Sequence, residues 1–142
     1  GQGGRLFGRL REESGLAYAV GASSLEGPFG GVVTCGLATD PARVHEAEAK
    51  LLAAIDGIRE GDVTDGEVAR ARAACVGAAE AGLQTVGARC AAMVYAELYG
   101  LGGVAYRRLS RRAEPVTTAD VRGVARDVFS RPTVVGRLEP RP

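Results

Sequence analysis

The spacing of hydrophobic and polar residues changes once near the beginning of the chain, at Gly15. Before this residue, Leu6, Phe7 and Leu10 lie on one face of a short predicted helix, with charged residues on the opposite face. Gly15 is typical of a helix end, because a residue in the left-handed conformation is least strained when it has no Cβ. Apolar residues then alternate with a period of two, as in a strand. The pattern therefore predicts that a helix ends and a strand begins here.

The rest of the pattern predicts one more strand, several helices and a closing strand. A turn at Glu26-Gly27-Pro28 leads to a second strand over residues 31–39, and a last strand is expected over residues 133–138. Between these two strands the pattern predicts helices. They run from Asp40-Pro41 to Gly61, from a capping box at Thr64 and Glu67 with a break between Gly82 and Gly87, over a short arginine-rich segment, and from Thr117 to Pro132. This order predicts an α+β fold, with an antiparallel sheet and helices packed on one of its faces. Such a thin sheet has unpaired edges, so we expect a homo- or hetero-oligomer.

Composition narrows the class of protein without identifying a function. A chain of 142 residues with 46% hydrophobic and 25% charged residues is typical of one soluble globular domain. Its net charge of +1 gives no argument for a nucleic-acid or membrane partner. No apolar run approaches the roughly 18–20 residues of a membrane span. The cytoplasm and the periplasm of a bacterium are both compatible with this composition, which leaves the compartment undecided.

The residues that commonly bind metals are few and dispersed. Cys35, Cys75 and Cys90 are odd in number and widely spaced, which argues against a disulfide framework or a Cys-x-x-Cys site. We expect them to be small buried hydrophobic residues. His45 is the only histidine. Although glutamates lie beside it, one histidine provides one ligand, so we expect a solvated side chain on a helix face and no metal site.

The junction also contains a series of short motifs. It reads Gly3-Gly4, Arg5-Leu6-Phe7, Leu10-Arg11-Glu12 and Gly15-Leu16-Ala17-Tyr18, with Val20 shortly after. This series resembles the helix-to-strand junction in the C-terminal half of the pitrilysin/insulinase family of zinc peptidases, which includes the mitochondrial processing peptidases. Glu97-Leu98-Tyr99-Gly100 and the helix that begins near Thr117 are similar to later parts of that domain, so the resemblance covers nearly the whole chain. Gly4 and Ser14 depart from the family pattern, where a serine and a basic residue are usual.

The resemblance implies roles for Arg11 and Tyr18. In active members of the family, the matching arginine and tyrosine reach across a central chamber to the substrate and to the oxyanion at a zinc site carried by the other half. Both residues also have an ordinary structural explanation. An arginine near a helix end interacts favourably with the helix dipole, and a tyrosine at a strand commonly packs.

The zinc-binding hallmark of the family, His-x-x-Glu-His, is absent from this sequence. The resemblance therefore implies that residues 1–142 are a single partial domain of the processing-peptidase type, namely the inactive, substrate-contacting C-terminal half, entered partway through. No cofactor or metal is expected in this chain, and zinc is expected in a catalytic domain elsewhere. The implied partners are that His-x-x-Glu-His domain and a peptide substrate.

Two other functions agree with the same sequence. A non-catalytic relative of the same architecture would serve as a scaffold or assembly subunit, and it would have no chemical need for Arg11 and Tyr18. An unrelated α+β protein that binds a small molecule would require the motif series to be accidental.

Overall fold

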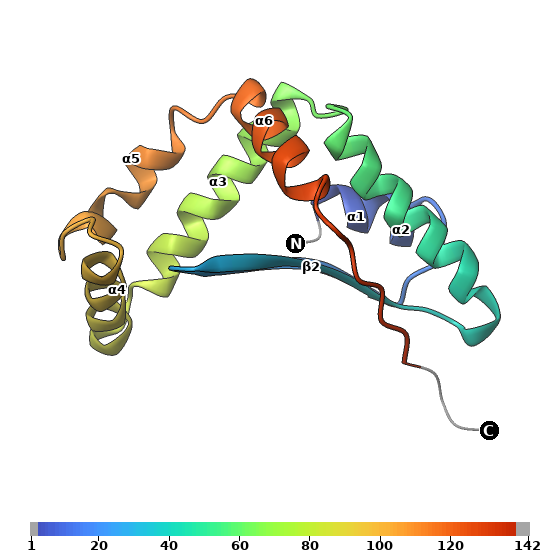
Figure 1. Ribbon diagram of the computed structural model, residues 1–142, viewed down its shortest axis with the longest axis horizontal. Helices are drawn as coiled ribbons and strands as arrows, with labels where there is room; N and C mark the ends of the chain where they lie inside the picture. Colours follow the sequence, from blue (N-terminus) through green and yellow to red (C-terminus); the bar gives the residue numbers. More distant parts are fainter. Residues whose placement is uncertain (1–2, 139–142) are drawn as a thin grey trace. The chain divides into compact units, whose positions relative to one another are not determined.

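The computed structural model describes residues 3–138, with the backbone alone for residues 109 and 110 (Figure 1). The chain forms two compact units, which are described separately. The hairpin unit comprises Gly1–Glu26, Gly31–Val63 and Arg122–Pro142, and the helical unit comprises Gly27–Gly30 and Thr64–Val121.

The hairpin unit begins with the predicted change from helix to strand. Its elements are α1 (Arg5–Phe7), a π-helix η1 (Gly8–Glu12), β1 (Ala19–Gly27), β2 (Gly30–Ala38), a 3₁₀ turn η2 (Pro41–Arg43) and α2 (Val44–Arg59). The two strands form a two-stranded antiparallel sheet, and α1 and α2 lie on one side of β2 in Figure 1. The α+β fold class is thereby confirmed.

The hairpin is covered only near its base. In β1, Val20 is half-buried and every other residue is exposed, and in β2 only Cys35 and Leu37 are half-buried. These three residues lie close to where the hairpin joins the rest of its unit. The outer part of the sheet, including Leu25 at 71% exposure, has both faces open.

The predicted closing strand is wrong. No strand forms over residues 133–138, and Val134 and Leu138 are 94% and 101% exposed. Alternating residues favour an extended backbone, but a strand also needs an edge with which to pair, and β1 and β2 pair with each other alone in the described range. The segment is held instead by a side chain, since Arg137 Nε donates to Glu48 Oε2 of α2 at 2.6 Å. This hydrogen bond lowers the pKa of Glu48.

The buried core consists mainly of small side chains. The buried hydrophobic residues of the described range are Leu10, Leu16, Ala17, Ala47, Ala54, Val63, Val68, Ala96 and Ala125. Leu10 is the largest of the fully buried side chains, with no exposed surface. Most of these residues belong to the hairpin unit, where they surround the beginning of the chain and α2.

The helical unit contains α3 (Asp65–Gly82), α4 (Val86–Leu98), a 3₁₀ turn η3 (Ala105–Arg108) and α5 (Leu109–Ala113), and α6 (Thr118–Phe129) begins within it. The predicted break after Gly82 is confirmed. Thr85 caps α4, because its hydroxyl accepts from the Ala88 N–H at 3.2 Å.

The predicted capping box of α3 forms, and α6 begins with a second one. Thr64 Oγ1 accepts from the Glu67 N–H at 3.3 Å, and Glu67 Oε2 accepts from the Thr64 N–H at 3.0 Å. At the beginning of α6, Thr117 and Asp120 make the same reciprocal pair. Hydrogen bonds from Thr117 lower the pKa of Asp120.

The expectation that all three cysteines are buried is wrong. Cys75 and Cys90 are exposed on α3 and α4, and Cys35 is half-buried. Burial raises the pKa of the Cys35 thiol. Within the described part of the helical unit, Val68 and Ala96 are the buried hydrophobic residues, so the unit has little core into which further cysteines could be packed.

The Thr64 capping box gives a direct test of how α3 begins. Thr64→Ala removes the acceptor for the Glu67 N–H and should lower the free energy of unfolding by about 1 kcal/mol. Thr64→Ser keeps the hydroxyl and is the matched control. Urea unfolding followed by circular dichroism measures both, and equal stability of the two variants would contradict the capping role.

Candidate functional site

The carbonyl of Leu10 closes the helix that precedes the first strand. It accepts hydrogen bonds from the N–H groups of Leu16 at 2.9 Å and of Ala17 at 3.1 Å. Gly15, directly before Leu16, has a φ of +56°, a left-handed conformation that favours glycine, and its N–H donates to the Arg11 carbonyl at 3.2 Å. The backbone therefore reverses within a few residues while its polar groups remain paired.

The helix that leads to this reversal is wider than an α-helix. η1 is a π-helix, and the Glu13 N–H reaches five residues back to the Gly8 carbonyl at 2.9 Å. Isolated π-turns are rare and occur frequently at functional sites.

Two side chains from the end of the hairpin and the beginning of α2 hold the junction from the other side. Thr39 Oγ1 donates to the Leu16 carbonyl at 2.6 Å in a partly buried hydrogen bond. Arg43 Nη1 donates to the Gly15 carbonyl at 3.3 Å. The carbonyls of the two residues that follow the helix end are thus satisfied by residues more than twenty positions away.

A second group of contacts fixes the beginning of the chain to the loop after α2. Arg5 Nη1 and Arg9 Nη2 each lie 3.0 Å from Asp62 Oδ2, and Arg5 also donates to the Asp62 carbonyl. The hydrogen bond from Arg9, together with the charge of Arg5, lowers the pKa of Asp62. The Arg5 side chain is 10% exposed, so this end of the group is largely covered by protein.

The structure places both predicted site residues on this junction, with their side chains exposed. Arg11 lies in η1, and its guanidinium carbon is 5.2 Å from the centre of the Phe7 ring, a cation–π contact. Tyr18 precedes β1 and is 71% exposed, while its N–H donates to the Ala38 carbonyl at 2.8 Å. The Tyr18 hydroxyl makes no hydrogen bond to another residue of the described range. Each side chain is thus available to a ligand on a backbone that is held in place.

The donor set of the described residues does not fit a zinc ion. Within residues 3–138, no group of three or more histidine, cysteine, aspartate or glutamate side chains could hold a metal. His45 is exposed on α2, as expected. A catalytic zinc needs three protein ligands and a water, so no zinc-dependent step can be assigned to these residues.

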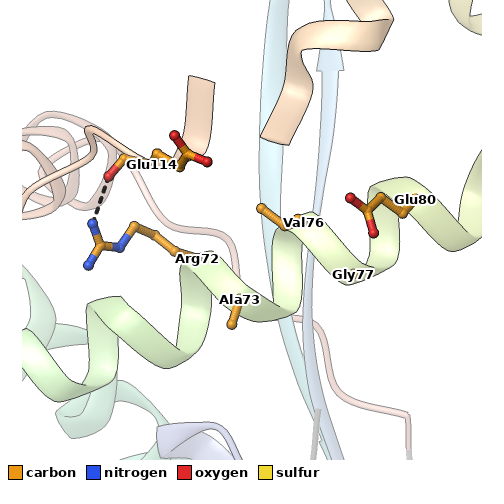
Figure 2. Close-up of a pocket in the computed structure, with 6 residues that line it drawn as sticks. All are labelled: Arg72, Ala73, Val76, Gly77, Glu80 and Glu114. Carbon is orange, nitrogen blue, oxygen red and sulfur yellow. Dashed lines mark hydrogen bonds between the residues drawn. The ribbon is translucent and has the colours of Figure 1, made fainter. Parts of the chain in front are cut away.

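One surface hollow of the described residues lies in the helical unit, away from these residues in sequence. It has a volume of about 500 Å³ and is lined by Arg72, Ala73, Val76, Gly77, Glu80 and Glu114. Figure 2 shows Arg72 directed to Glu114, where its Nη1 donates to the backbone carbonyl at 2.7 Å. A smaller hollow of about 220 Å³ is lined by residues of η1 and α2, including Ser14 and Lys50, which bond to each other. The lining residues of the hollow in the helical unit include no serine, threonine or cysteine that could act as a nucleophile.

No sequence motif identifies the residues whose side chains bond to the junction. Thr39, Arg43 and Asp62 lie far from Arg11 and Tyr18 in sequence. The local sequence places Thr39 at the end of a strand, Arg43 at the start of a helix and Asp62 in a loop, and none of these settings indicates a contact with the junction. Their contacts with the junction exist only in the folded chain.

The comparisons with known proteins agree with this architecture. The family described as peptidase M16 inactive domain matches residues 1–75, more than half of the chain. The chain therefore belongs to the peptidase M16 family, the pitrilysin-like zinc peptidases, and matches its inactive domain. The family predicted from the junction motifs is confirmed.

Two individual proteins are also similar to this chain. It is 32% identical to an uncharacterized zinc protease of Streptomyces coelicolor, over 98% of this chain and 31% of that protein. A crystal structure of a conserved protein from Enterococcus faecalis V583 has the same fold, with a TM-score of 0.73 and 23% identity over 88% of this chain and 29% of that chain. The chain thus spans less than a third of the length of these relatives. Over residues 3–138, no helix is long and apolar enough to cross a bilayer.

Two glycines of the junction should respond in opposite ways to alanine. Gly15→Ala places a Cβ on a left-handed residue and should lower the free energy of unfolding by about 1–2 kcal/mol. Gly8→Ala is the matched control, because Gly8 has a right-handed φ of −55° and open space for a Cβ, and it should raise stability by up to about 1 kcal/mol. Urea unfolding measures both, and a Gly15→Ala variant as stable as the parent chain would refute the left-handed helix end.

The Asp62 contacts should make the free energy of unfolding depend on pH. Because the folded-state pKa of Asp62 is depressed, its contribution is present above the unfolded value of about 3.9 and is lost as pH falls through the folded pKa. Asp62→Asn should therefore reduce stability at pH 7 and have a smaller effect at pH 2–3. Urea unfolding at both pH values measures this, with Asp56→Asn, which breaks an exposed pair within α2, as control. An equal loss at both pH values would contradict it.

Proposed function

We propose that this chain is part of a zinc metallopeptidase and that Arg11 and Tyr18 contact a peptide substrate held at a zinc site elsewhere. That site would belong to a His-x-x-Glu-His domain, either in the same polypeptide or in a partner subunit. Membership of the inactive-domain family and similarity to an uncharacterized zinc protease support a role beside a catalytic domain. The absence of a metal-binding group among the described residues agrees with a contribution made without zinc in this chain.

The observation that carries the proposal is the contrast between the backbone and the side chains at the junction. The backbone of residues 10–18 is tied by hydrogen bonds to Ala38, Thr39 and Arg43, while Arg11 and Tyr18 are exposed. A catalytic side chain must be held in place to act in the transition state, yet it must remain accessible to substrate. A packing arginine or tyrosine would not need this combination.

The chemistry of the pair suits the polarised carbonyl of a peptide. A guanidinium remains charged at neutral pH and donates through a planar group, and a phenol donates one hydrogen bond from a stiff ring. When water adds to a peptide carbonyl, its oxygen becomes negative. Donors aimed at that oxygen stabilise the transition state more than the ground state. In the proposed assembly, Arg11 and Tyr18 provide such donors, and Arg11 also binds the backbone of the substrate.

We also propose that the hairpin unit and the helical unit belong to one partial domain that acts in an oligomer or in a longer chain. The exposed hairpin, with its unpaired edges, supports association. A scaffold subunit of the same fold would associate as well, but it would not require the Arg11 and Tyr18 donors.

The test is made in the assembled peptidase. Arg11→Ala and Tyr18→Phe should each lower kcat by roughly 10²- to 10³-fold, the usual effect of removing one oxyanion donor. Association with the catalytic domain should change little, because both side chains are exposed and Tyr18→Phe keeps the ring. Turnover of a peptide substrate and association by sedimentation are measured separately.

Arg89→Ala and Tyr95→Phe are the matched controls, since both residues are exposed on α4 in the other unit. These variants should retain parent turnover. Parent turnover by Arg11→Ala and Tyr18→Phe would rule out the transition-state role, and weaker assembly in the same variants would favour a scaffold.

A further inference from the structure

We infer that Thr39 is a positioning residue, whose hydroxyl sets the direction of Tyr18; the catalytic consequence of this rests on the proposed function. Thr39 is half-buried between β2 and η2. Its hydroxyl donates to the Leu16 carbonyl at 2.6 Å, while the carbonyl of the preceding residue, Ala38, accepts the Tyr18 N–H at 2.8 Å. Ala38, the last residue of β2, and Thr39, directly after it, therefore hold the backbone on both sides of Ala17.

The Tyr18 side chain has little else to direct it. It is 71% exposed, and its hydroxyl has no hydrogen bond to another residue of the described range. The direction of its Cα–Cβ bond consequently depends on the backbone dihedral angles of residues 16–18. Leu16 and Ala17 are 2% and 6% exposed, so the segment before Tyr18 is fixed from the protein side by packing as well.

The Thr39 hydroxyl is itself well oriented. Ala38, before it, is the last residue of β2, and Asp40, after it, caps η2 by accepting the Ala42 N–H at 2.8 Å. A threonine side chain has restricted χ1 freedom because it branches at Cβ. The Thr39 backbone is therefore fixed on both sides and its side chain has few rotamers, so the hydroxyl can fix the position of the Leu16 carbonyl and of the backbone that leads to Tyr18.

The substitution that isolates this hydrogen bond is Thr39→Val, which keeps the shape and removes the donor. In the complete enzyme it should lower kcat by up to about 10²-fold with KM little changed, because a small misplacement of a catalytic group has effects of this size. Thr39→Ser restores the hydroxyl and should restore turnover. Thr34→Val is the matched control, since Thr34 is exposed in β2 and its hydroxyl has no hydrogen bond within the described residues.

A double-mutant cycle separates positioning from general damage. If Thr39 acts through Tyr18, Thr39→Val should have almost no further effect on kcat in a Tyr18→Phe background. Equal losses in both backgrounds, or failure of Thr39→Ser to restore turnover, would overturn the inference. Thr39→Ala takes the place of Thr39→Val in the same cycle if the valine variant does not fold.

A spectroscopic measurement keeps the inference testable if Tyr18 has no role in turnover. With 3-fluorotyrosine incorporated, the fluorine resonance of Tyr18 is assigned by its loss in Tyr18→Phe. Thr39→Val should shift or broaden this resonance, while Thr39→Ser and Thr34→Val should not. An unchanged Tyr18 resonance in Thr39→Val would overturn the positioning role, whereas parent turnover by Tyr18→Phe would overturn the proposed function alone.

Discussion

The geometry of the candidate site depends on a single backbone acceptor, the carbonyl of Leu10. The Leu10 side chain is completely buried, and the Leu10 carbonyl oxygen accepts hydrogen bonds from the N–H groups of Leu16 and Ala17, just before β1. A π-turn brings the chain to this point, and a left-handed glycine allows it to reverse. Burial therefore fixes the position of the acceptor, and the acceptor fixes the path of residues 15–18. Tyr18 is the last residue of that path, and Arg11 lies in the π-helix before it.

The fold class and most element boundaries follow from local patterns in the sequence. Gly15, the Thr64 capping box and the break after Gly82 each have a local physical cause, and each is where the sequence predicts it. A cap, a left-handed glycine or a helical period involves residues within about a turn of one another. Such features can be inferred without knowing the tertiary structure.

The errors arise where a second segment decides the outcome. Residues 133–138 alternate as a strand should, but they pair with no strand edge, and Arg137 bonds to α2 instead. Cys75 and Cys90 are apolar enough to be buried, yet the described helical unit has too few buried residues to cover them. Sequence patterns specify the preference of a segment, whereas pairing and burial also require a partner.

The same limit applies to the candidate site. The motif series draws attention to Arg11 and Tyr18, but it says nothing of the residues that hold them, because Thr39 and Arg43 contact the junction through tertiary structure. These contacts are to backbone carbonyls, which every residue has. The types of the contacted residues therefore give no sequence signal for the contacts. The sequence presents Arg11 and Tyr18 as two isolated residues. In the folded chain both are exposed, on a backbone whose carbonyls accept hydrogen bonds from Thr39, directly after β2, and from Arg43 of η2. In the proposed function, these two side chains donate to the substrate from a backbone that is already held in place, which is the physical requirement for stabilising charge that develops only in a transition state.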